Sequence, residues 1–367
     1  MLLVRASFFC ILFLFASVSS GATPIKVFLL AGQSNMTGWA STSGLSADLS
    51  QSQPAVLIRA NGDVYWKNAR KWLQCGPGFG HALGCFGPEL TFGKSVTGPV
   101  PGKKIALIKY TVGGTELATR WRPPSSGGEV GDLYVKFIYE IGISLATLDS
   151  NYIPEIAAVL WMQGEYDAKN LSYANEYQYN LANFINDIRA KLNNPQLPFI
   201  IGMIDEQNLW PYSQIVRTAE NTVAKTLSNV GIFDTRGFPT DGVHYQRDGM
   251  IRLGQSFALN YVTRFVQSVH VARAQGPALP ESFRAVVCGS SIRIFLPVHQ
   301  TQQSLAVTLL DLSGREIISP VNTVTCGGEF TVGLDRRNPS FPPVAPKACV
   351  LAVSFGQESW RVLGFVK

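Results

Sequence analysis

Five apolar runs, each followed by small or polar residues, divide the first two thirds of the chain. Runs of this kind are typical of buried strands in a parallel sheet that is covered on both faces. The runs lie at residues 27–31, 104–110, 156–161, 198–204 and 230–235. Between them, apolar residues at helical spacing predict helices at 133–148, 173–192, 213–227 and 247–266. This alternation predicts a three-layer α/β/α fold built on a parallel sheet.

Polar or small residues follow four of these strands. Ser34 comes after the first strand, Gly114 after the second, Gln163 after the third and His244 after the fifth. In open α/β sheets, ligands bind outside the carboxyl ends of the strands. We therefore expect these four residues to meet at one edge of the sheet.

The stretch from residue 41 to residue 101 is rich in Ser, Gly and Pro and predicts a long irregular segment. Long loops that carry aromatic residues often form the walls of binding sites. Trp66 and Trp72, together with Asn35 beside the first turn, are the residues expected to form such a wall here.

Ser34 and His244 suggest acyl-transfer chemistry. A serine hydroxyl needs a base to become a nucleophile, and His244 is the one of the four histidines that follows a predicted strand closely. Asp241, three residues earlier, can orient the imidazole and stabilise its protonated form. The backbone N–H groups of Ser34 and Gly114 and the side-chain amide of Gln163 are candidate donors to an oxyanion.

These motifs resemble the four sequence blocks of the SGNH/GDSL hydrolase superfamily, which has a flavodoxin-like fold. The similarity spans residues 25–266 and is greatest to the sialate O-acetylesterase-like branch that includes the acetylxylan esterases of carbohydrate esterase family 6. A further segment at 86–92 resembles a Gly-Pro-containing segment of that branch. The blocks lie at 32–36, 113–114, 161–167 and 241–244.

The resemblance implies a serine esterase that needs no metal and no cofactor. It implies that Ser34 is the nucleophile, His244 the base and Asp241 its partner, with Ser34, Gly114 and Gln163 forming the oxyanion hole. Glu165 is an alternative to Asp241 as the acid. Met162 departs from the pattern, because a histidine is common at that position.

The N-terminus has the order of a secretory signal. A basic residue, an apolar core and small residues fill residues 1–22, so we expect a secreted or cell-surface protein whose esterase domain spans 23–270. No later segment is apolar enough to predict a membrane span. In an oxidising compartment, Cys75 and Cys85 would close the loop between them as a disulfide.

Residues 271–282 predict a linker. The short β-like runs within 283–367 predict a small β-sandwich-like module, either a sorting domain or a carbohydrate-binding one.

Composition narrows the class of partner. Only 15% of the 367 residues are charged and the net charge of +6 is not concentrated in a block, so nucleic acid is not an expected partner. We expect a monomer that removes acetyl groups from a polysaccharide, most simply acetylxylan. The alternatives are a sialate O-acetylesterase and a non-catalytic sugar-binding protein on an esterase scaffold.

Overall fold

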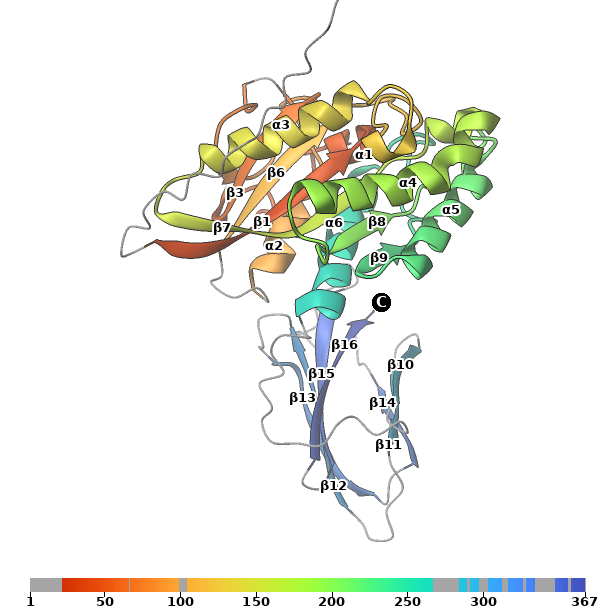
Figure 1. Cartoon of the computed structure of the whole chain (residues 1–367). Coiled ribbons are helices and arrows are strands. Elements are labelled where there is room, and N and C mark those ends of the chain that lie inside the picture. Colours follow the sequence, from red (N-terminus) through yellow and green to blue (C-terminus); the bar gives the residue numbers. More distant parts are fainter. Residues whose placement is uncertain are drawn as a thin grey trace, which may run out of the picture.

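A seven-stranded, mostly parallel sheet forms the centre of the fold, in the strand order β4-β3-β6-β1-β7-β8-β9 (Figure 1). The computed structural model describes residues 22–65, 67–98 and 104–266, and the backbone of seven further strands between 284 and 366. The five predicted strands are present, in the order 2-1-3-4-5 that is typical of flavodoxin-like sheets. They are β1 (Thr23–Gly32), β6 (Ile105–Thr111), β7 (Tyr152–Met162), β8 (Phe199–Gly202) and β9 (Val230–Phe233).

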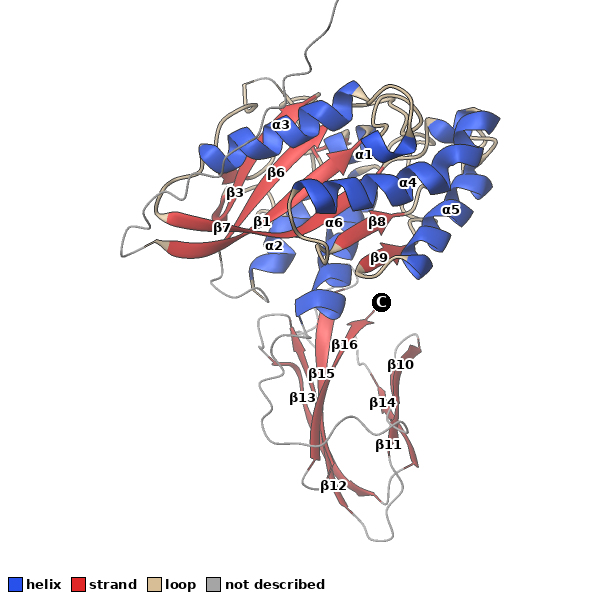
Figure 2. Ribbon diagram, in the orientation of Figure 1, coloured by secondary structure: helices blue, strands red, loops and turns tan. Residues whose placement is uncertain are grey.

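Helices cover both faces of this sheet, as predicted (Figure 2). Alternate residues of β1 enter opposite cores, with Val27 and Leu29 on one side and Phe28 and Leu30 on the other. The first face packs against α3 (Asp132–Ala146), α4 (Leu171–Lys191) and α5 (Ser213–Thr226). The second packs against α1 (Ser34–Thr37), α2 (Glu89–Thr97) and α6 (Arg247–Tyr261), which continues as a π-helical turn, Val262–Val266.

The prediction of an irregular segment at 41–101 is wrong in its middle. Strand β3 (Gln53–Gly62) pairs in parallel with β6, and β4 (Leu73–Cys75) adds an antiparallel edge, while β2 (Ala40–Ser41) pairs with β5 (Cys85–Phe86). Two buried polar residues interrupt the apolar pattern of β3. Arg59 and Asn61 both bind the carboxylate of Glu140 on α3, at 2.7 and 2.6 Å, so their polar character does not indicate exposure.

Strand β1 lies at the topological switch point of the sheet. The chain continues from β1 towards β6 on one side and returns to β7 on the other. A crevice forms at the carboxyl end of a strand flanked in this way, since the loops on its two sides diverge. Ser34 directly follows β1, so the topology places it at that crevice.

A buried ion pair lies beneath this edge. Lys109 on β6 and Glu89 on α2 are both fully buried, and the Nζ–Oε2 distance is 2.6 Å. The Lys109 ammonium also donates to the backbone carbonyls of Thr37, at the end of α1, and of Phe79. Burial lowers the pKa of Lys109, and Glu89 opposes that shift. The pair therefore joins a central strand to the helix that carries Ser34.

The predicted disulfide between Cys75 and Cys85 is not formed, and both are free thiols. The buried Cys75 thiol instead contacts the carbonyl of Glu89 at 3.9 Å, and Cys85 pairs with Ser41 in the small two-stranded sheet. Burial is the main reason that the pKa of Cys75 is raised well above its ordinary value. That shift keeps the thiol protonated and disfavours its oxidation.

The C-terminal strands form two antiparallel sheets. One has the order β10-β11-β14 and the other the order β13-β12-β15-β16. Their bounds are β10 (Arg284–Cys288), β11 (Ser291–Leu296), β12 (Gln303–Asp311), β13 (Glu316–Thr325), β14 (Gly328–Gly333), β15 (Lys347–Phe355) and β16 (Glu358–Val366). The all-β character predicted for this segment is seen in the backbone. Residues 1–21 of the predicted signal and the whole predicted linker lie outside the described residues. Within the described residues, no helix has the length and apolarity to cross a membrane.

The Lys109–Glu89 pair gives a prediction for stability. Lys109→Met should lower the free energy of unfolding by about 3–5 kcal/mol, because it leaves a buried carboxylate without its counter-ion. The measurement is urea denaturation of the full chain. Lys26→Met is the matched control, since it removes an ion pair with Glu155 whose side chains are 35% and 46% exposed. We expect that control to cost at most about 1 kcal/mol, and equal losses in both variants would contradict the prediction.

Candidate active site

Ser34 lies in a tight turn between β1 and the short helix α1. Gly32 ends the strand with a φ of 139°, and a Cβ at that position would lie 2.0 Å from the carbonyl oxygen of Met162. Only glycine fits there, because β7 approaches the turn so closely. The N–H of Gln33 donates to that same carbonyl at 3.2 Å. The turn is thus fixed to the neighbouring strand, and Ser34 is only 7% exposed.

The turn after β6 faces Ser34. A Cβ on Gly113 would lie 3.5 Å from Cβ of Ser34, and Gly114 has a φ of +61°. Asp63 accepts the N–H of Gly113 at 2.8 Å, so that donor is occupied. Within the described part of the chain, the backbone N–H groups of Ser34 and Gly114 have no hydrogen-bond acceptor. These two N–H groups are therefore available to a ligand in the pocket.

Gln163 does not line the pocket, although its predicted role in the oxyanion hole would place its amide there. Its side chain is fully buried, and Nε2 donates to the carbonyl of Thr115 at 2.8 Å and to Asp167 at 2.6 Å. Both amide hydrogens are therefore used inside the protein. Asp167 also accepts the N–H groups of Leu117 and Ala118. Together Gln163 and Asp167 hold the segment that follows Gly114.

Asn35, predicted as part of a substrate wall, is a structural residue. It is 2% exposed, and its Nδ2 donates to Glu165 at 2.8 Å and to the carbonyl of Val243 at 3.3 Å. Its Oδ1 accepts the N–H of Tyr245 at 3.1 Å. One amide thus joins the Ser34 turn to the end of β7 and to the loop that carries His244.

His244 and Asp241 lie in one short loop. The Asp241 carboxylate accepts the backbone N–H groups of Val243 at 2.9 Å and of His244 at 2.7 Å through Oδ1. Partial burial opposes the shift, but these N–H donors lower the pKa of Asp241 and keep it ionised. Burial lowers the pKa of His244, and the Asp241 charge opposes this. The predicted pairing is electrostatic here, since the hydrogen bonds of Asp241 go to the loop backbone.

Glu165, the alternative acid, is buried beside the pocket. One carboxylate oxygen binds Asn35, and the other has no hydrogen-bond partner in the described part of the chain. Burial raises the pKa of Glu165, and the hydrogen bond from Asn35 opposes that shift. Its charged form is consequently less favoured than that of Asp241.

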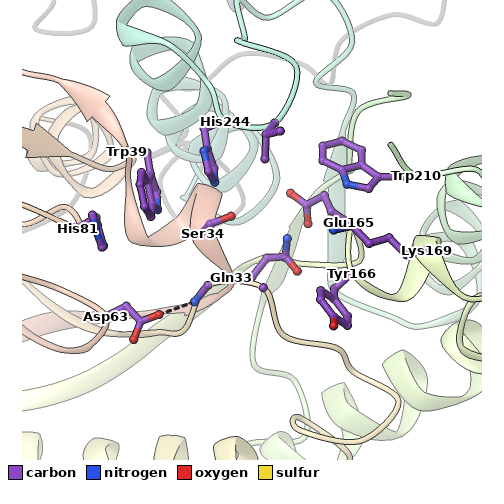
Figure 3. A pocket seen from close by; sticks show the side chains of 13 residues that line it. Gln33, Ser34, Trp39, Asp63, His81, Glu165, Tyr166, Lys169, Trp210 and His244 are labelled. Atoms are coloured by element: carbon purple, nitrogen blue, oxygen red, sulfur yellow. Dashed lines mark hydrogen bonds between the residues drawn. The ribbon is translucent and has the colours of Figure 1, made fainter. Parts of the chain in front are cut away.

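Ser34 and His244 open onto one pocket of about 280 Å³ (Figure 3). Besides Ser34, His244, Gly114 and Glu165, its lining includes four more residues of the sequence blocks, Gln33, Gly113, Tyr166 and Val243. It also includes residues that the sequence did not indicate, which are Trp39, Asp63, His81, Lys169 and Trp210. Trp72, one of the two tryptophans predicted as a wall, is not among them. Trp72 is packed against the core and its indole N–H donates to the carbonyl of Ser144, and Trp66 lies outside the described residues.

Three parallel rings form one side of this pocket. Trp39 stacks on His244 with ring centroids 4.7 Å apart and planes within 4°, and on His81 with centroids 3.8 Å apart and planes within 9°. Trp39 follows α1 by one residue after Gly38, but nothing in its sequence context indicates stacking. Within the residues that the structure describes, no group of three His, Cys, Asp or Glu side chains is arranged to hold a metal ion.

Comparison with known proteins shows which family this sequence matches. The sequence model of a family described as carbohydrate esterase, sialic acid-specific acetylesterase, matches residues 24–263. A probable carbohydrate esterase of Arabidopsis thaliana is 28% identical over 264 residues, which cover 68% of this chain and 94% of that protein. An X-ray structure from Arabidopsis thaliana superposes with a TM-score of 0.55 at 25% identity, over 66% of this chain and 99% of that one.

A carbohydrate acetylesterase from Xanthomonas citri shares the fold at 20% identity. The TM-score is 0.50, over 88% of this chain and 74% of that one. Residues 22–266 alone could not supply so large a share of this chain, so the similarity extends into the C-terminal strands.

The environment of His244 gives a prediction for its titration. Because burial favours the neutral ring, the pKa of His244 should lie below its ordinary value of 6.5. The measurement is an NMR titration of the protein labelled with ¹³C-histidine, in which the loss of one signal in His244→Gln assigns the resonance. A midpoint at or above 6.5 would contradict the burial of this ring.

Proposed function

This chain belongs to the carbohydrate esterase family of sialic acid-specific acetylesterases, and we propose that it is a secreted serine esterase that removes O-acetyl groups from carbohydrate. The observation that carries the proposal is the pocket at the switch point, where Ser34 and His244 line one cavity with two free backbone N–H groups. A volume of about 280 Å³ fits an acetyl group and part of the sugar that bears it.

The reaction begins with attack of the Ser34 Oγ on the acetyl carbonyl carbon. His244 takes the hydroxyl proton, and the N–H groups of Ser34 and Gly114 donate to the oxyanion that forms. The tetrahedral species collapses as the C–O bond to the sugar breaks, and His244 gives its proton to the departing sugar oxygen. Water then attacks the acetyl-enzyme while His244 takes one of its protons, and His244 returns that proton to the Ser34 Oγ as the acyl–Oγ bond breaks and acetate leaves.

Asp241 is the acid that we assign to His244. Its pKa is lowered, so it is ionised when the imidazolium forms, and its charge acts directly on His244. Glu165 remains the alternative, because it lines the pocket and one of its carboxylate oxygens has no hydrogen-bond partner among the described residues. Its raised pKa makes it the weaker partner for a developing positive charge.

The substrate that we propose first is acetylated xylan, with acetylated sialic acid as the alternative. The name of the family favours the second, and the predicted secretory signal is compatible with either. A third candidate function is that of a carbohydrate-binding protein that uses the same pocket but has no catalytic activity. It is disfavoured because both the hydroxyl and the imidazole needed for acyl transfer line the cavity.

The proposal predicts that Ser34→Ala lowers kcat on an acetyl ester by at least about 1,000-fold, because it removes the nucleophile. Acetate release should be followed from acetylated xylan and from O-acetylated sialic acid in parallel. Ser172→Ala, which removes an exposed hydroxyl on α4, is the matched control and should retain wild-type turnover.

Release from xylan that disappears in Ser34→Ala would support both the mechanism and the substrate. Release from sialic acid alone would keep the mechanism and change the substrate. Full activity of Ser34→Ala, or no release from either substrate by the wild type, would overturn the proposed function.

A further inference from the structure

The ring of His244 is held by stacking. Its imidazole forms no hydrogen bond with another side chain among the described residues, and the Oδ1 of Asp241 accepts two backbone N–H groups of the same loop. One ring face lies on Trp39, with the planes parallel within 4°. A general base must present one nitrogen to the nucleophile, so the orientation of this plane decides whether proton transfer is possible.

Trp39 is itself fixed from two directions. His81 covers its other face at a centroid distance of 3.8 Å, and the N–H of His81 donates to the carbonyl of Gly38 at 2.9 Å. The next residue, Ala40, pairs with Phe86 in the small sheet formed by β2 and β5. The Trp39 side chain is therefore anchored to the loop of His81 and to the strand that follows it.

We propose that Trp39 is the positioning residue of the catalytic base, and that His81 supports it from the opposite face. Figure 3 shows the three rings side by side at the edge of the pocket, with His244 nearest to Ser34. This inference rests on the proposed function, in which Ser34 is the nucleophile and His244 the base. It adds two residues that act through His244 and do not touch the reacting atoms.

The stack also affects the charge that His244 acquires during the reaction. Proton transfer from Ser34 converts the imidazole to imidazolium, and the face of an indole attracts a cation. Trp39 thus restricts the ring in its neutral form and favours its protonated form. Both effects act on turnover, whereas binding of the ground-state ester depends on neither.

A second role for an aromatic residue in such a pocket is to stack on a sugar ring. Trp39 is 42% exposed, but a histidine ring stacks on each of its faces, so neither face is wholly open to a ligand. Sugar stacking requires a free face. The geometry therefore favours positioning over substrate binding, and the two roles differ in the kinetic constant that they control.

The test compares Trp39→Ala with Trp39→Phe, using kcat and KM for 4-nitrophenyl acetate. We expect Trp39→Ala to lower kcat by at least about tenfold with KM changed by less than about threefold, since a general base contributes about 100- to 10,000-fold only when it is aligned. Trp39→Phe should recover kcat to within about threefold of wild type, because a planar ring remains. Tyr139→Ala, which removes an aromatic side chain that is 63% exposed on α3, is the control.

Substitution of His81 provides a second, independent test of the proposal. His81→Ala should lower kcat by less than Trp39→Ala does, and the double variant should match Trp39→Ala alone, because His81 acts only through the indole. Circular dichroism of each variant checks that the fold is intact, and the expected loss of kcat in His81→Ala carries the test if Trp39→Ala does not fold.

Three results would overturn the inference. They are an unchanged kcat in Trp39→Ala, a change confined to KM, and a loss in Trp39→Phe as large as in Trp39→Ala. These outcomes are separable from failure of the proposed function. If the proposed function is wrong, Ser34→Ala keeps its activity. If only the positioning role is wrong, Ser34→Ala is inactive and Trp39→Ala keeps its activity.

Discussion

The buried ammonium of Lys109 organises the edge of the sheet where Ser34 lies. It has three acceptors, the carboxylate of Glu89 and the carbonyls of Thr37 and Phe79, which belong to three separate segments. Glu89 also accepts the N–H of Gly87, so the same pair fixes the entrance to α2. A buried charge is tolerated only when all its partners are in place. The helix that carries Ser34, the loop before His81 and α2 are thus assembled together around one cation.

Polar residues in the sequence blocks serve mainly to connect the loops of the site. Asn35 joins the Ser34 turn to Glu165 and to the His244 loop, and the buried Asp167 holds the segment after Gly114. The pKa of Asp167 is raised to about 7, chiefly by its burial, although Gln163 and two N–H groups oppose the shift. Eight of the 18 residues in the blocks line the pocket, and the other ten do not. This division explains why a block can be recognisable in sequence while most of its side chains never contact substrate.

The sequence was sufficient for the periodic parts of the fold and for the residues tied to strand ends. Continuous apolar runs predicted five of the parallel strands, and their common direction predicted that Ser34, Gly114 and His244 would meet. Prediction failed where polar residues are buried, as in β3, where Arg59 and Asn61 bind Glu140 on a helix far away in sequence. Spacing alone also suggested a disulfide that the separate packing of Cys75 and Cys85 does not form.

The roles of Gln163 and Trp39 show a further limit of sequence reasoning. The type of a residue shows which hydrogen bonds its side chain can donate, but the acceptors around it in the fold decide where those hydrogens go. Gln163 has a suitable amide, yet Thr115 and Asp167 take both of its hydrogens inside the fold. Trp39 has no catalytic group and was not singled out, yet its ring lies against the imidazole of His244. Burial lowers the pKa of His244 and the Asp241 charge opposes that shift, so the neutral ring is favoured, while the Asp241 charge and the face of Trp39 stabilise the ring once it is protonated.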